Sequence, residues 1–235
     1  MTRERIDPPI AIALDYGSLD EAKRTIDALA EQVRVFKVGL QLFTAAGPAA
    51  VRAVHDRGCD VFLDLKVGDI PNTAAGAVAS AAGIGARFLT IHSSGGPTMV
   101  RAAVEAAAGG APKLLVVSVL TSLDEAEMAA TGVMRPLSDQ VDAMAALAVA
   151  AGAPGLVLAA TEVARIRAAY PDLFLLVPGI RPAWAQADDQ KRMGTPAQVV
   201  ADGADLMVLG RAVTAAADPS GALARVLEEI NGVKV

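Results

Sequence analysis

The stretch FLDLKVGDIPNT, residues 62–73, joins a run of apolar residues to a group of charged ones. The apolar part has the length and composition of a strand that is buried on both faces. Asp64, Lys66 and Asp69 lie at or after its carboxyl end, where buried charges cost free energy unless they are paired or used. Pro71 then favours the first turn of a helix. The stretch therefore predicts a strand, a charged loop and a helix in succession.

Similar apolar runs recur along the chain, and each is nearly continuous rather than alternating. We expect strands at residues 10–15, 35–39, 61–66, 88–93, 113–120, 155–159, 173–180 and 205–210. Helical spacing of apolar residues occurs between them, at 19–33, 44–57, 98–108 and 138–150. Strands that alternate with helices predict an α/β fold, and eight of them predict a (β/α)8 TIM barrel. With 235 residues, against about 250 for a typical barrel, we expect one domain over residues 1–235.

An open, doubly wound sheet is the alternative architecture for the same alternation. Such sheets often carry a G-x-G-x-x-G or G-x-x-x-x-G-K-[S/T] loop directly after a strand. Neither motif occurs in this sequence, so the barrel is favoured. The connection at residues 121–137 is long for a barrel and is rich in polar and small residues.

Composition narrows the possible functions. The net charge is −5 and no block of lysine and arginine occurs, so we expect no nucleic-acid partner. Cys59 is the single cysteine, which excludes an internal disulfide bond, and the presence of only two histidines argues against a Cys/His metal site.

Hydropathy gives no indication of a membrane partner. The first apolar run is short and ends at Asp15, so it does not resemble the core of a signal peptide. Residues 145–160 are interrupted by glycine and proline and fall short of the ~20 residues that span a bilayer. We therefore expect a cytoplasmic protein.

The charged residues of the opening stretch have a neighbour on the preceding strand. Side chains two residues apart on a strand point to the same side, so Asp64 and Lys66 project together. Lys37 lies at the equivalent end of the preceding strand, and with Asp69 the four charges can alternate in sign. Each opposite charge then stabilises the charged form of its neighbours. One interpretation is a structural ion-pair network, and the other is a proton donor held beside a carboxylate that repels an anionic substrate group.

A second polar group follows the last two strands. PGIR, residues 178–181, ends the seventh predicted strand, and Gly210 with Arg211 ends the eighth. The loops after these two strands form the usual phosphate site of such barrels, where backbone N–H groups and an arginine hold a dianion. Gln190 lies between them and can add an amide contact. The alternative is a plain turn followed by a surface arginine.

Taken together, the motifs resemble the bacterial form of the orotidine 5′-phosphate decarboxylase family. They are DLKVGDIPNT, ALD at the first strand, FKVG at the second, LTS at the fifth, PGIR at the seventh and GRA at the eighth. The resemblance covers roughly residues 10–211. The D-x-K-x-x-D element alone is shared with sugar-phosphate decarboxylases and aldolases, whereas IPNT and the PGIR…Q…GR set are more specific.

The resemblance implies conversion of orotidine 5′-monophosphate to UMP and CO2, the last step of de novo pyrimidine synthesis, without a metal or an organic cofactor. It also implies a homodimer of barrels with active sites at the subunit interface. By position, Lys66 matches the lysine that protonates C6 of the pyrimidine, and Asp64 the aspartate beside the substrate carboxylate. Asp69 and Thr73 match residues that reach the site of the neighbouring subunit.

The other matched positions are implied to bind substrate. Asp15 and Lys37 match residues that hold the ribose hydroxyls and complete the charge network, which makes Lys37 part of the catalytic set. Thr121 and Ser122 match a pair near the pyrimidine, where the serine reads the base. The positions implied near the phosphate and the seventh loop are Pro178, Arg181, Gln190, Gly210 and Arg211.

One position departs from the family pattern. The family often has histidine directly before the second aspartate of D-x-K-x-x-D, and this chain has Gly68. That histidine is not the proton donor, so the functional expectation is unchanged. His92, in IHSSGG, matches a motif of the fourth strand, where we expect a packing or supporting role.

Two other functions fit parts of the pattern. A sugar-phosphate decarboxylase of the same superfamily, such as one acting on 3-keto-gulonate 6-phosphate, needs Mg²⁺, and the absence of an acidic residue next to Lys37 argues against it. A nucleotide-binding barrel without catalysis would retain the phosphate site, but the intact D-x-K-x-x-D set argues against that function.

Overall fold

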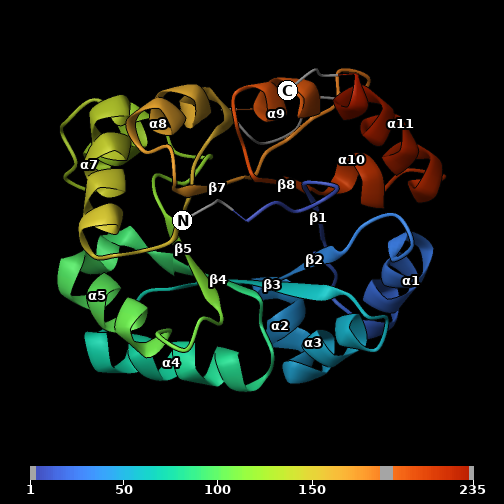
Figure 1. Ribbon diagram of the computed structural model, residues 1–235, viewed down its shortest axis with the longest axis horizontal. Coiled ribbons are helices and arrows are strands. Elements are labelled where there is room, and N and C mark those ends of the chain that lie inside the picture. Colours follow the sequence, from blue (N-terminus) through green and yellow to red (C-terminus); the bar gives the residue numbers. More distant parts are fainter. Residues whose placement is uncertain (1–3, 186–192, 233–235) are drawn as a thin grey trace.

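The computed structural model describes residues 4–185 and 193–232. Its strands form a closed parallel barrel in the order β1 to β8, surrounded by helices (Figure 1), which confirms the predicted (β/α)8 fold. The strands are β1 (Ile10–Ala13), β2 (Val35–Gly39), β3 (Asp60–Val67), β4 (Phe88–His92), β5 (Lys113–Val117), β6 (Gly155–Val157), β7 (Phe174–Val177) and β8 (Leu206–Leu209).

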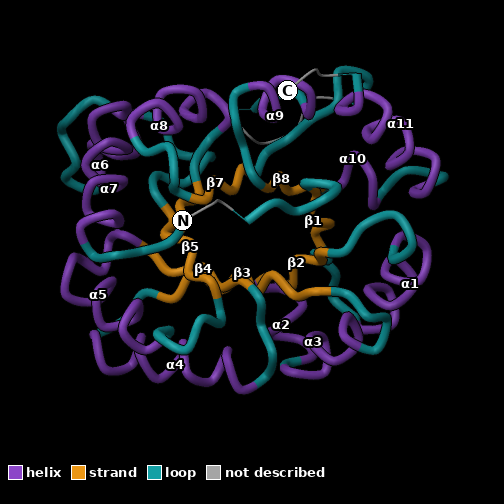
Figure 2. Tube along the Cα trace, in the orientation of Figure 1, coloured by secondary structure: helices purple, strands orange, loops and turns teal. Residues whose placement is uncertain are grey.

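The helices form an outer ring around the strands (Figure 2). They are α1 (Leu19–Leu29), α2 (Leu40–Ala46), α3 (Pro48–His55), α4 (Pro71–Gly83), α5 (Gly96–Ala106), α6 (Glu125–Ala130), α7 (Leu137–Ala150), α8 (Val163–Ala169), α9 (Pro196–Ala201), α10 (Arg211–Thr214) and α11 (Pro219–Asn231), with short 3-10 turns η1 (Ser93–Gly95) and η2 (Ala160–Glu162).

The observed helices and strands differ from the predicted ones in three places. The helix predicted at 44–57 is two helices, because Gly47 between them has a left-handed backbone (φ 55°). The connection at 121–137 contains α6, whose first turn is closed by a capping box between Asp124 and Glu127. The strand predicted at 113–120 ends at Val117, because the apolar residues that follow it line a cavity instead of continuing the sheet.

Side chains of the strands divide into two buried sets, as alternation along a strand requires. One set, with Leu63 and Ile91, packs between the barrel and the helices. The other fills the barrel interior and includes Phe62, Phe88 and Phe174. The ring of Phe88 stacks on that of Phe174 with 5.5 Å between centroids and meets the ring of Phe62 edge-on at 6.4 Å. These three rings form an apolar layer across the barrel.

The N-terminal segment covers the amino end of the barrel, and Figure 1 shows it crossing in front of the strands. Ile6 packs into the interior set, and Glu4 pairs with both Arg87 and Lys113. Arg87 also pairs with Asp60 at the start of β3. Burial alone would raise the pKa of Glu4, but hydrogen bonds from Arg87 and Lys113, with their positive charges, lower it below 4.5.

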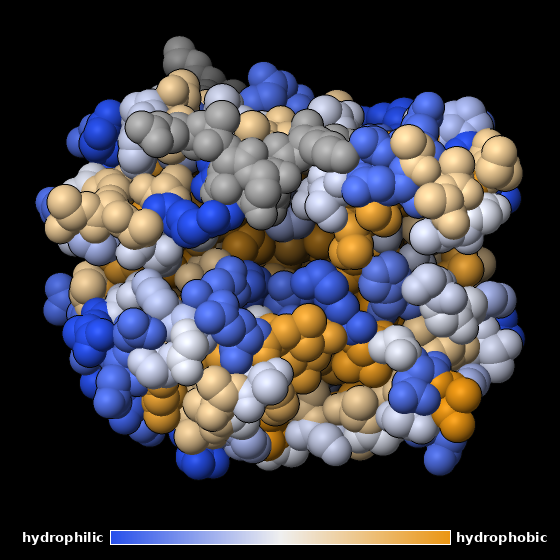
Figure 3. Space-filling view, turned by 180° about the vertical axis from the view of Figure 1, so that it is seen from behind, coloured by the Kyte–Doolittle hydropathy of each residue, from blue (hydrophilic) through white to orange (hydrophobic). Residues whose placement is uncertain are grey.

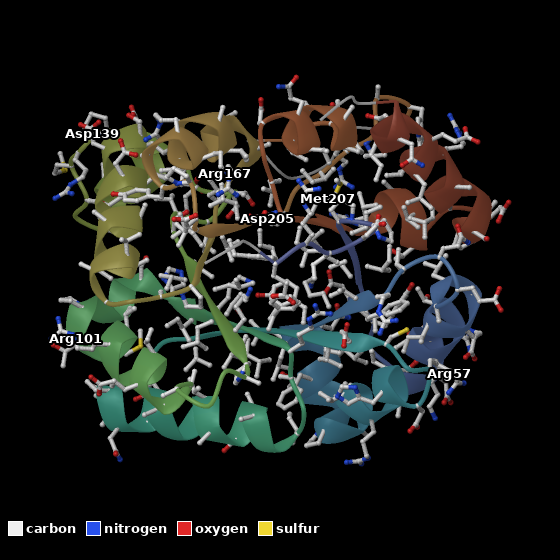
Figure 4. The ribbon with its side chains drawn as sticks, viewed as in Figure 1. Arg57, Arg101, Asp139, Arg167, Asp205 and Met207 are labelled. Carbon is white, nitrogen blue, oxygen red and sulfur yellow. The ribbon has the colours of Figure 1, made fainter. Side chains whose placement is uncertain are left out.

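A second ion pair supports the last two strands. Arg167 on α8 and Asp205, directly before β8, lie against each other between helix and barrel (Figure 4). Their nitrogen and oxygen are 2.6 Å apart, and both side chains are largely buried. Asp205 also accepts the backbone N–H of Leu175 on β7, at 2.8 Å. The pair therefore fixes the starts of β7 and β8 relative to α8.

None of the helices in the described part of the chain is long and apolar enough to cross a membrane.

Candidate active site

A cavity of about 670 Å³ lies at the carboxyl ends of the strands. Figure 3 shows this face, opposite to that of Figure 1, with hydrophobic residues inside a central hollow and hydrophilic residues along its border. Phe62, one of the three rings of the phenylalanine layer, also lines the cavity. The predicted site residues that line it are Asp15, Lys37, Asp64, Lys66, Thr121, Pro178, Arg181, Gly210 and Arg211.

Four of these side chains form a row of alternating charge. The Lys37 ammonium donates to Asp15 Oδ1 at 2.7 Å and lies 3.7 Å from Asp64 Oδ2. The Lys66 ammonium donates to both oxygens of Asp64, each at 2.9 Å. Lys37 and Asp64 are nearly buried, with side chains 10% and 13% exposed, whereas Lys66 is 33% exposed. Lys66 is thus the more exposed of the two lysines, and it lines the cavity.

The predicted row of alternating charges included Asp69, and this part of the prediction was wrong. Asp69 does not join the row within one chain, and Asp15 occupies that place. Asp69 is exposed in the loop before α4, and its carboxylate accepts the N–H of Ile70 at 2.6 Å. The reason is that β3 ends at Val67, so Asp69 has left the sheet.

Three other predicted site residues are not among the described residues that line the cavity. Thr73 is exposed in the first turn of α4, and Ser122 is exposed in the loop after β5. Neither lines the cavity in one chain. Gln190 lies outside the described residues.

Thr90 is a site residue that the sequence-based reasoning missed. It is 1% exposed on β4, and its hydroxyl donates to Asp64 Oδ1 at 2.9 Å. The hydroxyl oxygen of Thr90 also accepts the backbone N–H of Lys66 at 2.8 Å. The signal for it was available, because Thr90 is two residues beyond Phe88 on the inward face of the strand FLTIH.

Gly39 is a second residue that was missed. A Cβ at this position would lie 2.8 Å from Lys37 Nζ and 2.9 Å from Asp15 Oδ1, closer than real side chains approach. The absence of a side chain at the end of β2 therefore leaves room for the Asp15–Lys37 pair. The motif FKVG contains this glycine, but sequence alone does not show what its missing side chain would meet.

His92 ends β4 beside the charged row. Its Nδ1 lies 2.8 Å from the Ser94 hydroxyl. Burial lowers the pKa of His92 below its ordinary value of 6.5, and the positive charge of Lys66 lowers it further. Gly68 faces this histidine: a Cβ there would make ordinary contact, 3.5 Å from the Cβ of His92. Its backbone lies outside the left-handed region, so the structure does not require glycine at this departure from the family pattern.

The ends of β7 and β8 carry the predicted anion-binding residues. A single bridge between Ile180 and Gly194, with the Arg181 N–H donating to Gly194 at 2.9 Å, joins the two ends of the loop after β7. Arg211 opens α10 directly after Gly210. Arg181, Gly210 and Arg211 all border the cavity, at the place where barrels of this type bind phosphate.

The fold and the site together define a (β/α)8-barrel protein with a lysine–aspartate network and arginines at the carboxyl ends of its strands. Residues 8–226 match the model of the orotidine 5′-phosphate decarboxylase / HUMPS family, and the chain belongs to this family.

Relatives and solved structures agree with this membership. The chain is 47% identical over 230 residues to an orotidine 5′-phosphate decarboxylase of Paramagnetospirillum magneticum, covering 94% of this chain and 98% of the relative. It is 49% identical over 224 residues to that of Thermobifida fusca, covering 94% and 95%. A crystal structure of orotidine 5′-phosphate decarboxylase from Lactobacillus acidophilus is similar with a TM-score of 0.84 and 30% identity, covering 97% and 100%.

Proposed function

We propose that this chain decarboxylates orotidine 5′-monophosphate to UMP and CO2 and so acts in pyrimidine biosynthesis. The observation that carries the proposal is the Lys66 ammonium, held by both oxygens of Asp64 at the polar end of the cavity. Family membership and the names of the relatives support the same activity.

The reaction requires positive charge close to one carbon atom. When the bond between C6 and the carboxylate breaks, the electron pair remains on C6 in an orbital orthogonal to the ring π system, so resonance does not spread it. Charge already in place must stabilise this anion, and preorganised electrostatics is usually the largest catalytic contribution. Lys66 supplies the charge and then donates a proton from Nζ to C6. The resulting neutral amine regains a proton from solvent before the next turnover.

Asp64 has two parts in this proposal. It orients the Lys66 ammonium through two hydrogen bonds of 2.9 Å, and it lies where the carboxylate of the substrate is expected. Repulsion between the two carboxylates raises the free energy of the bound substrate, and loss of CO2 removes it. Lys37, 3.7 Å from Asp64 and 2.7 Å from Asp15, keeps the carboxylate in place and leaves Asp15 and Lys37 beside the ribose.

We assign the phosphate to the ends of β7 and β8. Arg181, Gly210 and Arg211 border the cavity there, and Gln190 is proposed as a further contact. Pro178 lies at the start of the same loop, and Thr121 with Ser122 is proposed to contact the pyrimidine. Binding energy from the phosphate, far from C6, can be used to orient the base against Lys66.

The proposal includes a homodimer and no metal or organic cofactor. Asp69 and Thr73 are proposed to enter the site of the neighbouring subunit, and their exposure supports this arrangement. Ile70, between them, is an apolar residue that is 68% exposed, and the proposed dimer would cover it. The proposed location is the cytoplasm.

The activity is tested by following the loss of orotidine monophosphate absorbance after adding purified protein that has been treated with EDTA. Turnover without added metal is expected. Turnover of a sugar phosphate that requires Mg²⁺ would instead place the chain with the sugar-phosphate decarboxylases. UMP binding without turnover of any substrate would indicate a nucleotide-binding barrel.

The shared site is tested by mixing two variants. Lys66→Ala and Asp69→Ala are each expected to be inactive. Re-associated mixtures contain hybrid dimers with one intact site, so roughly a quarter of the wild-type activity should return. Absence of any recovery, with hybrid dimers shown by mass spectrometry, would remove Asp69 from the neighbouring site.

A further inference from the structure

Among the hydrogen bonds of the described residues, the Thr90 hydroxyl is the one group that bonds to both Asp64 and the main chain of Lys66. It lies on β4, next to β3, and is 1% exposed. A buried hydroxyl has one proton to donate and can accept in return. Both capacities are used here: the proton goes to Asp64 Oδ1 at 2.9 Å, and the oxygen accepts the N–H of Lys66 at 2.8 Å.

The backbone of Lys66 needs such support. Its φ is 49°, in the left-handed region, and it is the only non-glycine residue of the described chain with a positive φ. A residue with a Cβ occupies this region at a cost and holds it only when its surroundings enforce it. Such conformations cluster at active sites, which makes the position of Lys66 informative.

The sheet does not enforce this conformation by regular pairing. The register between β3 and β4 shifts between Leu63 and Val67, so the ladder is interrupted where Lys66 lies. The Lys66 N–H bonds instead to the side chain of Thr90. One side-chain oxygen thus takes the place of a backbone acceptor, and the same side chain fixes the carboxylate that holds the Lys66 ammonium.

We propose that Thr90 is a positioning residue for the reaction: it acts through Asp64 and Lys66 and sets the direction of the Lys66 ammonium. The kinetic test of this inference rests on the proposed function, because it measures kcat. The structural test rests only on the geometry of Lys66. Thr90 itself does not line the cavity, so a direct contact with substrate is not part of the proposal.

The test compares Thr90→Val, which keeps the shape and removes the hydroxyl, with Thr90→Ser, which keeps the hydroxyl. For Thr90→Val we expect kcat to fall about 10²-fold, the loss that a small misplacement of reacting groups produces. KM and UMP affinity should change less than about threefold, because the residues at β7 and β8 are untouched. Thr90→Ser should restore kcat to within about fivefold of wild type.

A matched control removes a buried hydroxyl elsewhere in the barrel. Ser118 is fully buried, and its hydroxyl donates to the carbonyl of Val157 at 2.8 Å. Ser118→Ala should lower the melting temperature while kcat remains near wild type. A general effect of losing a buried hydrogen bond would instead lower kcat in both variants alike.

A crystal structure of Thr90→Val gives the second readout. We expect the φ of Lys66 to leave the left-handed region, or its ammonium to leave Asp64. Three results would each overturn the proposal: an unchanged Lys66 geometry in Thr90→Val, a kcat of Thr90→Val within about threefold of wild type, or a Thr90→Ser variant as impaired as Thr90→Val. If Thr90→Val does not fold, Thr90→Ala is measured against the same limits. A wild-type protein without decarboxylase activity would overturn the proposed function, and the structure of the variant would still decide the role of Thr90.

Discussion

The Lys66 ammonium lies 2.9 Å from each oxygen of Asp64, two residues before it on β3, although the backbone of Lys66 is left-handed. Side chains two apart on a regular strand share a face, but they stand parallel rather than pointing at one another. In this protein Lys66 has a left-handed backbone, and its side chain forms a direct ion pair with Asp64. The protein's own side chains hold these charges in place, which is what electrostatic preorganisation requires.

Replacing Lys66 with alanine should remove catalysis and leave the fold intact. We expect kcat to fall by about 10⁴-fold, because the variant loses both the proton donor and the positive charge. UMP should still bind, and the melting temperature should stay close to that of wild type. Lys113→Ala at the amino end of β5 is the control and should keep kcat. Near-normal turnover of Lys66→Ala would exclude Lys66 as the proton donor.

Replacing Arg211 with alanine should weaken substrate capture. A hydrogen bond to a charged group contributes about 1.5–3 kcal/mol, so kcat/KM should fall roughly 10- to 100-fold. Inorganic phosphate, tested as a competitive inhibitor, should also bind less well. Arg101→Ala is the matched control, because this arginine lies on α5 at the edge of the molecule (Figure 4). An unchanged kcat/KM would remove Arg211 from the phosphate site.

Gly39→Ala should disturb the charged row without unfolding the barrel. Its Cβ would meet Lys37 Nζ at 2.8 Å and Asp15 Oδ1 at 2.9 Å, so the ends of these flexible side chains must separate. We expect kcat/KM to fall about tenfold, in line with the loss of one hydrogen bond to a charged group. Gly76→Ala on α4 is the control, since its Cβ would meet nothing within 4 Å. Equal activities of the two variants would contradict the steric argument.

Glu4 should make stability depend on pH at the acidic end. Its pKa is lowered in the folded protein, so its contribution is fully present above the unfolded value of 4.5 and is lost as pH falls through the folded pKa. The melting temperature of Glu4→Gln should therefore lie below that of wild type at neutral pH. The difference should shrink as pH falls below 4.5. A difference that stays constant down to pH 3 would show that the charge of Glu4 does not stabilise the fold.

His92 can report on the charge of Lys66. Its pKa is lowered first by burial and second by Lys66, so removing the lysine charge should raise it part of the way toward 6.5. We expect the NMR titration midpoint of His92 to rise in Lys66→Met and to remain below 6.5, because burial persists. A midpoint that does not move would show that Lys66 exerts no electrostatic effect at His92.

The fold could be predicted from sequence because continuous apolar runs and helical spacing are local signals. The β-α-β order then leaves few architectures, and Pro71 placed the start of α4 correctly. The ends of the strands were predicted less well. Val119 and Leu120 were assigned to a strand because they are apolar, but they line the cavity instead of joining the sheet. Local sequence does not distinguish these two reasons for an apolar residue.

The site was predictable where chemistry is carried by charge. Lys37, Asp64 and Lys66 could be placed together from strand ends alone. Thr90 and Gly39 could not, because their importance depends on what neighbouring strands bring within 3 Å of them. The left-handed backbone of Lys66 could not be predicted either, since it coincides with a register shift between two strands.

The layer formed by the rings of Phe62, Phe88 and Phe174 also has a consequence for how CO2 leaves the proposed active site. Together with Ile6, these rings fill the barrel interior on the side away from the cavity. The proposed reaction chamber is therefore a dead end, and CO2 must escape past the nucleotide through the entrance used by the substrate. We therefore expect CO2 and UMP to leave through the same entrance, and the proposed phosphate contacts at β7 and β8 to control the release of UMP.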